Sequence, residues 1–187
     1  MGRVITDTSD WGMYVNTANG YQLKFPKNAR ISARAEDEDA LPLDKLNRAH
    51  IFVPGESTEV YVEAYAPRAA SAKTLDLAST LNQSAVLPLQ EFAEDIRQMQ
   101  VRDKSPYAAG KMIGELQDSL FAGQNAYSFT LTKTFTESSD GSYGYALPDG
   151  ATYNYVLLEN RSGTKLMIHY PLGDYTSESI AASFQLL

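Results

Sequence analysis

The two histidines of the chain, His50 and His169, are the side chains best suited to acid–base chemistry near neutral pH. Either could act as a general base, activate a nucleophile or ligate a metal. They lie far apart in the sequence, each in a segment that we expect to be a strand. In the expected C-terminal hairpin, His169 shares a face with Lys165 and Met167. We therefore predict that His169 occupies the more polar face of a sheet and has no catalytic role.

The familiar catalytic and phosphate-binding motifs are absent from the sequence. It has no Gly-x-Ser-x-Gly, Gly-x-Gly-x-x-Gly, Gly-x-x-x-x-Gly-Lys-Ser/Thr or His-Glu-x-x-His pattern. Zero cysteines exclude disulfides, thiolate nucleophiles and zinc sites built on Cys. We predict no enzyme activity, catalytic residue, metal site or cofactor. The alternative is an enzyme with an unrecognised carboxylate or tyrosine site, which a deep pocket holding two close carboxylates or a strongly perturbed titrating group would favour.

An acidic run, Glu36-Asp37-Glu38-Asp39, could hold a hard cation such as Ca²⁺. Consecutive acids in a loop point in different directions, and the run does not match the spacing of an EF-hand. We expect a solvated acidic loop, so calcium should leave the melting temperature unchanged.

Tyrosine is the enriched side chain, with twelve residues in all and six between Tyr143 and Tyr175. Tyrosines suit recognition surfaces because they combine large contact area with a polar tip. They are also ordinary strand residues, and this structural reading is favoured. A possible binding surface formed by Tyr143, Tyr145, Tyr153 and Tyr155 requires that their rings be exposed together.

Composition indicates a soluble globular protein of one domain, with 43% hydrophobic and 21% charged residues among 187. The net charge of −7 argues against nucleic-acid binding, which needs clustered Lys and Arg. No apolar stretch reaches the length of a membrane span, and the start lacks a signal-peptide pattern.

The N-terminus allows two interpretations. Gly2 with Thr6 fits the pattern for myristoylation. The favoured alternative is that the sequence starts after a removed leader, so that residues 1–10 are the remnant of a tether and residues 11–187 form the domain.

The elements that must position these residues follow from alternation, turn residues and helical spacing. Alternating residues predict strand pairs, and Asn19-Gly20 supplies a hairpin turn. The last expected helix places Ile180, Phe184 and Leu187 on one face, with Asp174, Thr176 or Ser177 as its N-cap. The expected strands are 11–16, 21–25, 50–53, 59–66, 112–120, 126–135, 152–159 and 164–170, and the expected helices are about 74–82, 88–102 and 175–184. Hairpins interrupted by a helical block predict an α+β fold with a central antiparallel sheet of six or seven strands.

Framework segments of the chain resemble the PsbP-like group, which includes extrinsic subunits of photosystem II, a Ran-binding import factor and bacterial envelope lipoproteins. The segments are Tyr14–Asn16, Gly20–Pro26, Gly123–Phe129, Leu166–Pro171 and Ile180–Phe184. The resemblance implies an α/β/α sandwich and a non-catalytic role. These are packing motifs, so no functional residue is carried over.

For the bacterial secreted branch, the resemblance also implies a lipid-anchored position outside the cytoplasm. We accordingly expect a binding or assembly module of the bacterial cell envelope. Its partner would be another protein, and it would contact the membrane only through a removed N-terminal anchor. The alternative is a cytoplasmic trafficking or chaperone-like partner, as in the import-factor branch.

Overall fold

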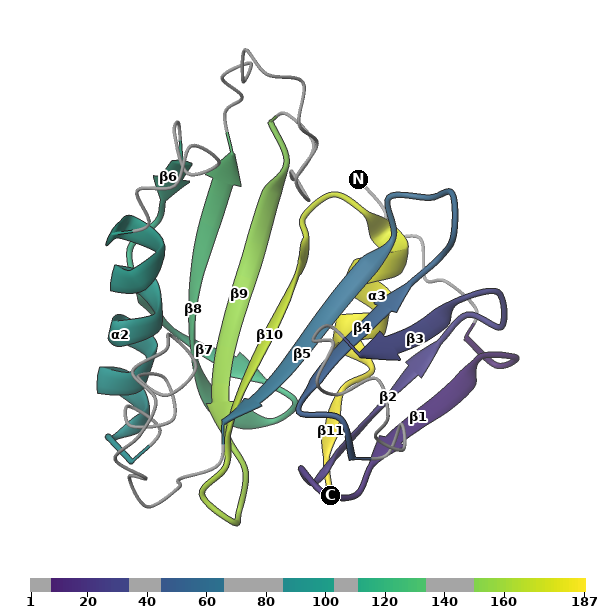
Figure 1. Cartoon of the computed structure of the whole chain (residues 1–187), viewed down its shortest axis with the longest axis horizontal. Coiled ribbons are helices and arrows are strands. Elements are labelled where there is room, and N and C mark those ends of the chain that lie inside the picture. Colours follow the sequence, from purple (N-terminus) through teal and green to yellow (C-terminus); the bar gives the residue numbers. More distant parts are fainter. Residues whose placement is uncertain (1–7, 34–44, 66–85, 103–110, 134–149) are drawn as a thin grey trace.

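A large antiparallel sheet is the centre of the fold in the computed structural model, which describes residues 8–33, 45–65, 86–102, 111–133 and 150–187 (Figure 1). The strand order is β3-β4-β5-β10-β9-β8-β6, and β7 also pairs with β8. The strands are β3 (Arg30–Ala33), β4 (Arg48–Phe52), β5 (Glu59–Tyr65), β6 (Lys111–Ile113), β7 (Gln117–Phe121), β8 (Gln124–Lys133), β9 (Thr152–Glu159) and β10 (Lys165–Pro171).

One face of this sheet is covered by a second, smaller sheet and a helix. The small sheet has the order β1-β2-β11, with β1 (Gly12–Asn16), β2 (Tyr21–Phe25) and β11 (Gln185–Leu186). The helix α3 (Tyr175–Ala182) follows β10 directly. Tyr21, Ile180 and Phe184 pack in one buried cluster with large-sheet residues such as Leu158 and Leu166.

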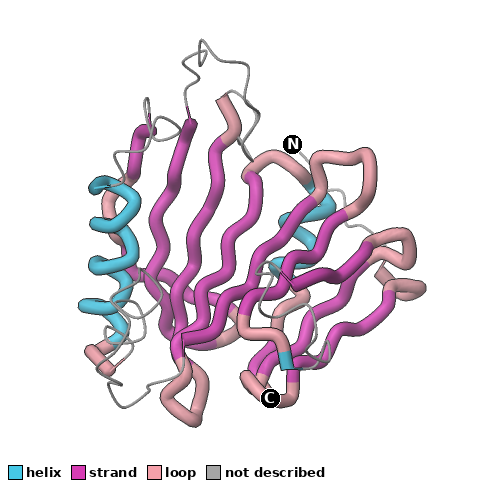
Figure 2. The backbone as a smooth tube through the Cα atoms, viewed as in Figure 1, coloured by secondary structure: helices cyan, strands magenta, loops and turns pink. Residues whose placement is uncertain are grey.

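The opposite face is covered at its β8–β9 end by the helix α2 (Leu89–Arg102). Phe92, Ala93 and Ile96 are buried, and they pack with Phe129 and Leu157 of the sheet. Adjacent residues of one strand, such as Leu157 and Leu158, belong to the two different clusters, as the alternation of a strand requires. Figure 2 shows the two helices on the two sides of the strands. The α+β class with a central antiparallel sheet is therefore confirmed.

The predicted end of the C-terminal helix is wrong. The helix begins after Asp174, whose side chain accepts a hydrogen bond from the Ser177 N–H, as one of the predicted caps. It ends at Ala182, however, and Leu187 is not on its buried face but 51% exposed. Phe184 is buried as predicted, and the chain then turns to pair Gln185 with Gln22.

The segment 112–120 forms two strands instead of one predicted strand. At Gly114 the N–H donates to the Thr130 carbonyl, and a Cβ there would lie only 2.7 Å from Thr130 Oγ1. β6 aligns Ile113 with Leu131 and β7 aligns Gln117 with Ser128, so the register along β8 shifts by one residue between them, and this shift divides the predicted strand in two. Because of this split and the unpredicted β3, the large sheet has eight strands among the described residues, more than the six or seven predicted.

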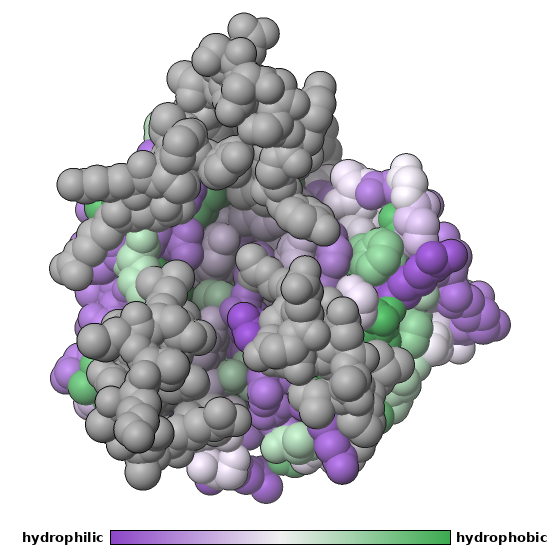
Figure 3. Space-filling view, viewed as in Figure 1, coloured by the Kyte–Doolittle hydropathy of each residue, from purple (hydrophilic) through white to green (hydrophobic). Residues whose placement is uncertain are grey.

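Two further expectations concern helices. The expected helix at 88–102 is confirmed as α2, and the expected helix at 74–82 lies outside the described residues. Neither helix in the described ranges has the length and apolar character that crossing a membrane requires. On the face seen in Figure 3, hydrophobic side chains of the described residues are interspersed with polar ones.

Candidate functional site

A row of five stacked rings crosses the large sheet and brings the two histidines together. The rings belong, in order, to His50, Tyr61, His169, Tyr155 and Phe129, which face one another in register on β4, β5, β10, β9 and β8. Neighbouring centroids are 4.1, 4.5, 4.8 and 4.9 Å apart, and the planes differ by at most 8°. We call this set the aromatic row. Both histidines stack on Tyr61, which sequence distance alone could not reveal.

Two carboxylates of β5, Glu59 and Glu63, flank Tyr61 on the same face. Glu59 accepts hydrogen bonds from the hydroxyls of Tyr61, at 2.9 Å, and of Tyr153. Its Oε2 also lies 3.5 Å from His50 Nε2. Glu63 accepts a 2.7 Å hydrogen bond from the Tyr65 hydroxyl, and its Oε1 lies 3.6 Å from His169 Nε2.

The surroundings of Glu59 favour its ionised form and the neutral form of Tyr153. Burial would raise the pKa of Glu59, but the neighbouring His50 imidazole and the hydrogen bonds from Tyr153 and Tyr61 outweigh it and lower that pKa below its ordinary value. Burial, together with the hydrogen bond to Glu59, raises the pKa of Tyr153 far above its ordinary value. Both pKa values therefore move away from neutrality, the reverse of what acid–base catalysis at neutral pH needs.

The His169 end of the cluster lies inside the protein, whereas the side chains of His50 and Glu59 are each 22% exposed. The side chains of His169 and Glu63 are 6% and 9% exposed. His169 shares its face with Lys165 and Met167 as predicted, but that face is buried at all three residues. Within the described ranges, no group of three His, Cys, Asp or Glu side chains could hold a metal ion. Packing and hydrogen bonding thus account for the row.

The predicted tyrosine surface stays only partly testable. Tyr153 and Tyr155 are buried, with exposed fractions of 2% and 8%, so neither offers its ring to a partner. Tyr143 and Tyr145 lie outside the described residues, as does the acidic run Glu36–Asp39.

A pocket of about 690 Å³ opens at the turn between β9 and β10. Three segments that are distant in sequence contribute to its wall: the β7–β8 turn, the β9–β10 turn and the last strand. The lining residues include Gln124, Glu159, Asn160, Arg161, Gln185 and Leu186. We call it the hairpin pocket. The sequence does not reveal this pocket, because no motif marks a hollow formed between two turns and a strand that are far apart in the chain.

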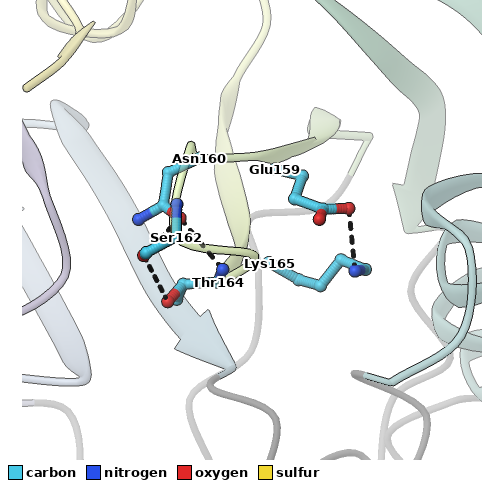
Figure 4. Close-up of polar contacts among 5 residues, drawn as sticks. All are labelled: Glu159, Asn160, Ser162, Thr164 and Lys165. Atoms are coloured by element: carbon cyan, nitrogen blue, oxygen red, sulfur yellow. Dashed lines mark hydrogen bonds and ion pairs between the residues drawn. The ribbon is translucent and has the colours of Figure 1, made fainter.

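Asn160 holds the turn beside this pocket through four hydrogen bonds of its buried side chain. Oδ1 accepts from the Ser162 N–H, the Ser162 hydroxyl and the Thr164 N–H, at 3.0, 2.7 and 2.9 Å. Nδ2 donates to the Asn19 carbonyl at 2.9 Å. Figure 4 shows Asn160 closing the turn on Ser162 and Thr164. The turn therefore has one fixed conformation.

A second anchor of the same hairpin is an ion pair. The Lys165 ammonium lies 2.8 Å from Glu159 Oε2, and the Lys165 side chain is only 5% exposed (Figure 4). Glu159 therefore already has a cationic partner inside the protein.

The anchoring continues into the small sheet. Asn16 and Asn19 both donate from Nδ2 to the Leu46 carbonyl, at 2.7 and 2.9 Å, and the Asn19 N–H donates to Asn16 Oδ1. Gly20 follows with φ +68°, and a Cβ there would lie 3.2 Å from Asn160 Nδ2. The predicted Asn19-Gly20 turn is confirmed, and it has a second role as a contact for the β9–β10 turn.

No protein-family model matches the sequence, and no curated protein matches it. Among solved structures, the chain is similar to the solution structure of cyanobacterial PsbP (CyanoP) from Synechocystis sp. PCC 6803. The TM-score is 0.55 at 13% identity, over 100% of this chain and 98% of that chain. At this identity the likeness concerns the fold. The resemblance predicted from the framework segments is thus confirmed at that level, and the chain has a PsbP-like fold.

Proposed function

We propose that the chain is a non-catalytic binding or assembly module whose partner is another protein. The observation that carries this proposal is the state of Glu59 in the aromatic row. Its carboxylate is committed to internal hydrogen bonds, and its lowered pKa keeps it ionised at neutral pH. A general acid or base would need a pKa near the working pH and room for a substrate.

The fold supports the same proposal. A PsbP-like fold suits a role as an extrinsic or assembly-type protein, and CyanoP, with which it shares that fold, comes from a cyanobacterium. The hairpin pocket supplies a preformed polar hollow at the surface, of a size typical of binding sites. We therefore assign binding to the hairpin pocket and packing to the aromatic row.

For location, we propose a position outside the cytoplasm, with the native chain tethered to the membrane of a bacterial envelope through an N-terminal lipidated segment. The sequence resemblance to the envelope branch supports this. A cytoplasmic trafficking role is the competing proposal. The codons upstream of Val4 distinguish them, because a leader ending in a lipidation cysteine supports the envelope and a leaderless start supports the cytoplasm.

Site-specific photo-cross-linking in the native cell tests the binding role. A photoreactive residue replaces Arg161 at the pocket in one variant and Val101, 53% exposed on α2, in a matched control. We expect one adduct of defined mass from position 161 and none from 101, unchanged when Glu59→Gln is added. Loss of the adduct with Glu59→Gln in a folded protein would contradict the assignment of roles. So would equal labelling at both positions.

A further inference from the structure

The wall of the hairpin pocket contains a strand edge that no described strand pairs with. β11 pairs on one side with β2, aligning Gln185 with Gln22 and Leu186 with Tyr21. The Leu187 N–H donates to the Gly20 carbonyl at 3.0 Å, so the pair formed by Gly20 and Leu187 is hydrogen-bonded. Bonded and non-bonded pairs alternate in an antiparallel ladder. The N–H and C=O of Leu186 therefore point away from β2, and Leu186 lines the pocket.

A positive charge lies at the same pocket. Arg161 is exposed in the β9–β10 turn, and the structure gives it no ion pair with any described residue. The nearest carboxylate in sequence, Glu159, is held by Lys165. A guanidinium presents a planar fork that binds a carboxylate through two parallel hydrogen bonds. The pocket therefore combines a main-chain donor and acceptor with an available cation.

The walls of the pocket are already fixed before any partner arrives. Asn160 holds one turn by four hydrogen bonds, and the rings of Phe121 and Phe184, with centroids 5.7 Å apart, pack the end of β7 against the residue preceding β11. A preformed site loses little conformational entropy when it binds.

We propose that the hairpin pocket binds an extended peptide segment of a partner protein by strand addition to β11. The segment would form main-chain hydrogen bonds with Leu186, and a carboxylate of the segment would bind Arg161. Strand addition gives affinity through the main chain, and the charged contact gives specificity. This inference rests on the proposed binding function and names the chemistry of its partner.

The test uses random twelve-residue peptides displayed on phage and selected against the full chain. The expected result is enrichment of peptides that carry Asp or Glu within alternating β-forming residues. Synthetic copies should bind Arg161→Glu at least about 10-fold more weakly, since charge-assisted pairs are among the stronger polar contacts. Lys27→Glu makes the same charge change at an exposed residue of another turn and should leave affinity unchanged. The proposal would be overturned if no peptides were enriched or if the enriched peptides lacked Asp and Glu. It would also be overturned if Arg161→Glu and Lys27→Glu weakened binding equally.

The strand geometry is tested by the amide of Leu186. In ¹H–¹⁵N spectra, this amide should shift and become protected from exchange when the selected peptide binds. Leu186→Pro removes the N–H that points away from β2 without removing a hydrogen bond to β2. It should therefore weaken peptide binding while the circular dichroism spectrum stays native. If that variant fails to fold, the protection measurement on the unaltered chain decides. An unprotected Leu186 amide in the saturated complex would refute strand addition. In that case, a cross-link from position 161 in the cell would still support the proposed binding function.

Discussion

Replacing Asn160 with alanine should destabilise the protein by about 3 kcal/mol, because this side chain makes four hydrogen bonds while 8% exposed. A hydrogen bond contributes roughly 1 kcal/mol net, and a buried group left without its partner costs more. The Ser162 hydroxyl can turn to water, so we discount its bond. The remaining bonds to the Thr164 N–H, the Ser162 N–H and the Asn19 carbonyl give the estimate.

The assay is urea unfolding followed by circular dichroism, with a thermal melt as a second measurement. For a chain of this length, about 3 kcal/mol corresponds to a melting temperature lower by roughly 6–12 °C. Ser162→Ala is the matched control, since it removes one bond to Asn160 from an exposed residue and should cost under about 1 kcal/mol. An Asn160→Ala protein within about 1 kcal/mol of the parent, or equal to Ser162→Ala, would refute the reasoning that Asn160 fixes the turn.

Three other substitutions test the row and the cap. Glu59→Gln should make the free energy of unfolding fall less steeply as the pH is lowered. A carboxylate whose pKa is lowered in the folded state stabilises the fold at pH values above its ordinary pKa of 4.5, and this stabilisation is lost as the pH falls through the folded-state pKa. Unfolding free energies at several pH values measure this, and an unchanged slope would contradict it. Asp174→Ala should cost about 1–2 kcal/mol in urea unfolding, because Asp174 caps α3 and accepts from Ser57; no loss would show that the cap is dispensable. His169→Ala should cost about 3 kcal/mol and reduce the near-ultraviolet dichroism, because it removes the middle ring of the row; a native spectrum would argue against the stacking.

Local patterns allowed much of the fold to be predicted. The hairpin at Asn19-Gly20, the strands of the terminal hairpin and the amphipathic helix α2 follow from alternation, turn residues and helical spacing, and all are present. The errors lie where a distant segment decides the outcome. The pairing register along β8 shifts by one residue between β6 and β7, and Leu187 leaves the helix because it donates to the Gly20 carbonyl.

The site was harder to predict than the fold, for a related reason. His50 and His169 each looked like a single strand residue, and only the order of β4, β5 and β10 places Tyr61 between them. Sequence spacing carries no information about such cross-strand neighbours. The hairpin pocket has the same origin, since residues around 124, 161 and 186 meet only after both sheets have formed.

Isothermal titration calorimetry with one selected peptide tests the separate roles of the hairpin pocket and the aromatic row in two variants. We expect the Glu59→Gln variant to bind the peptide within about 2-fold of the parent, and the Arg161→Glu variant to bind it at least about 10-fold more weakly. The opposite pattern, with affinity lost at Glu59 and kept at Arg161, would place recognition at the aromatic row and contradict the central claim.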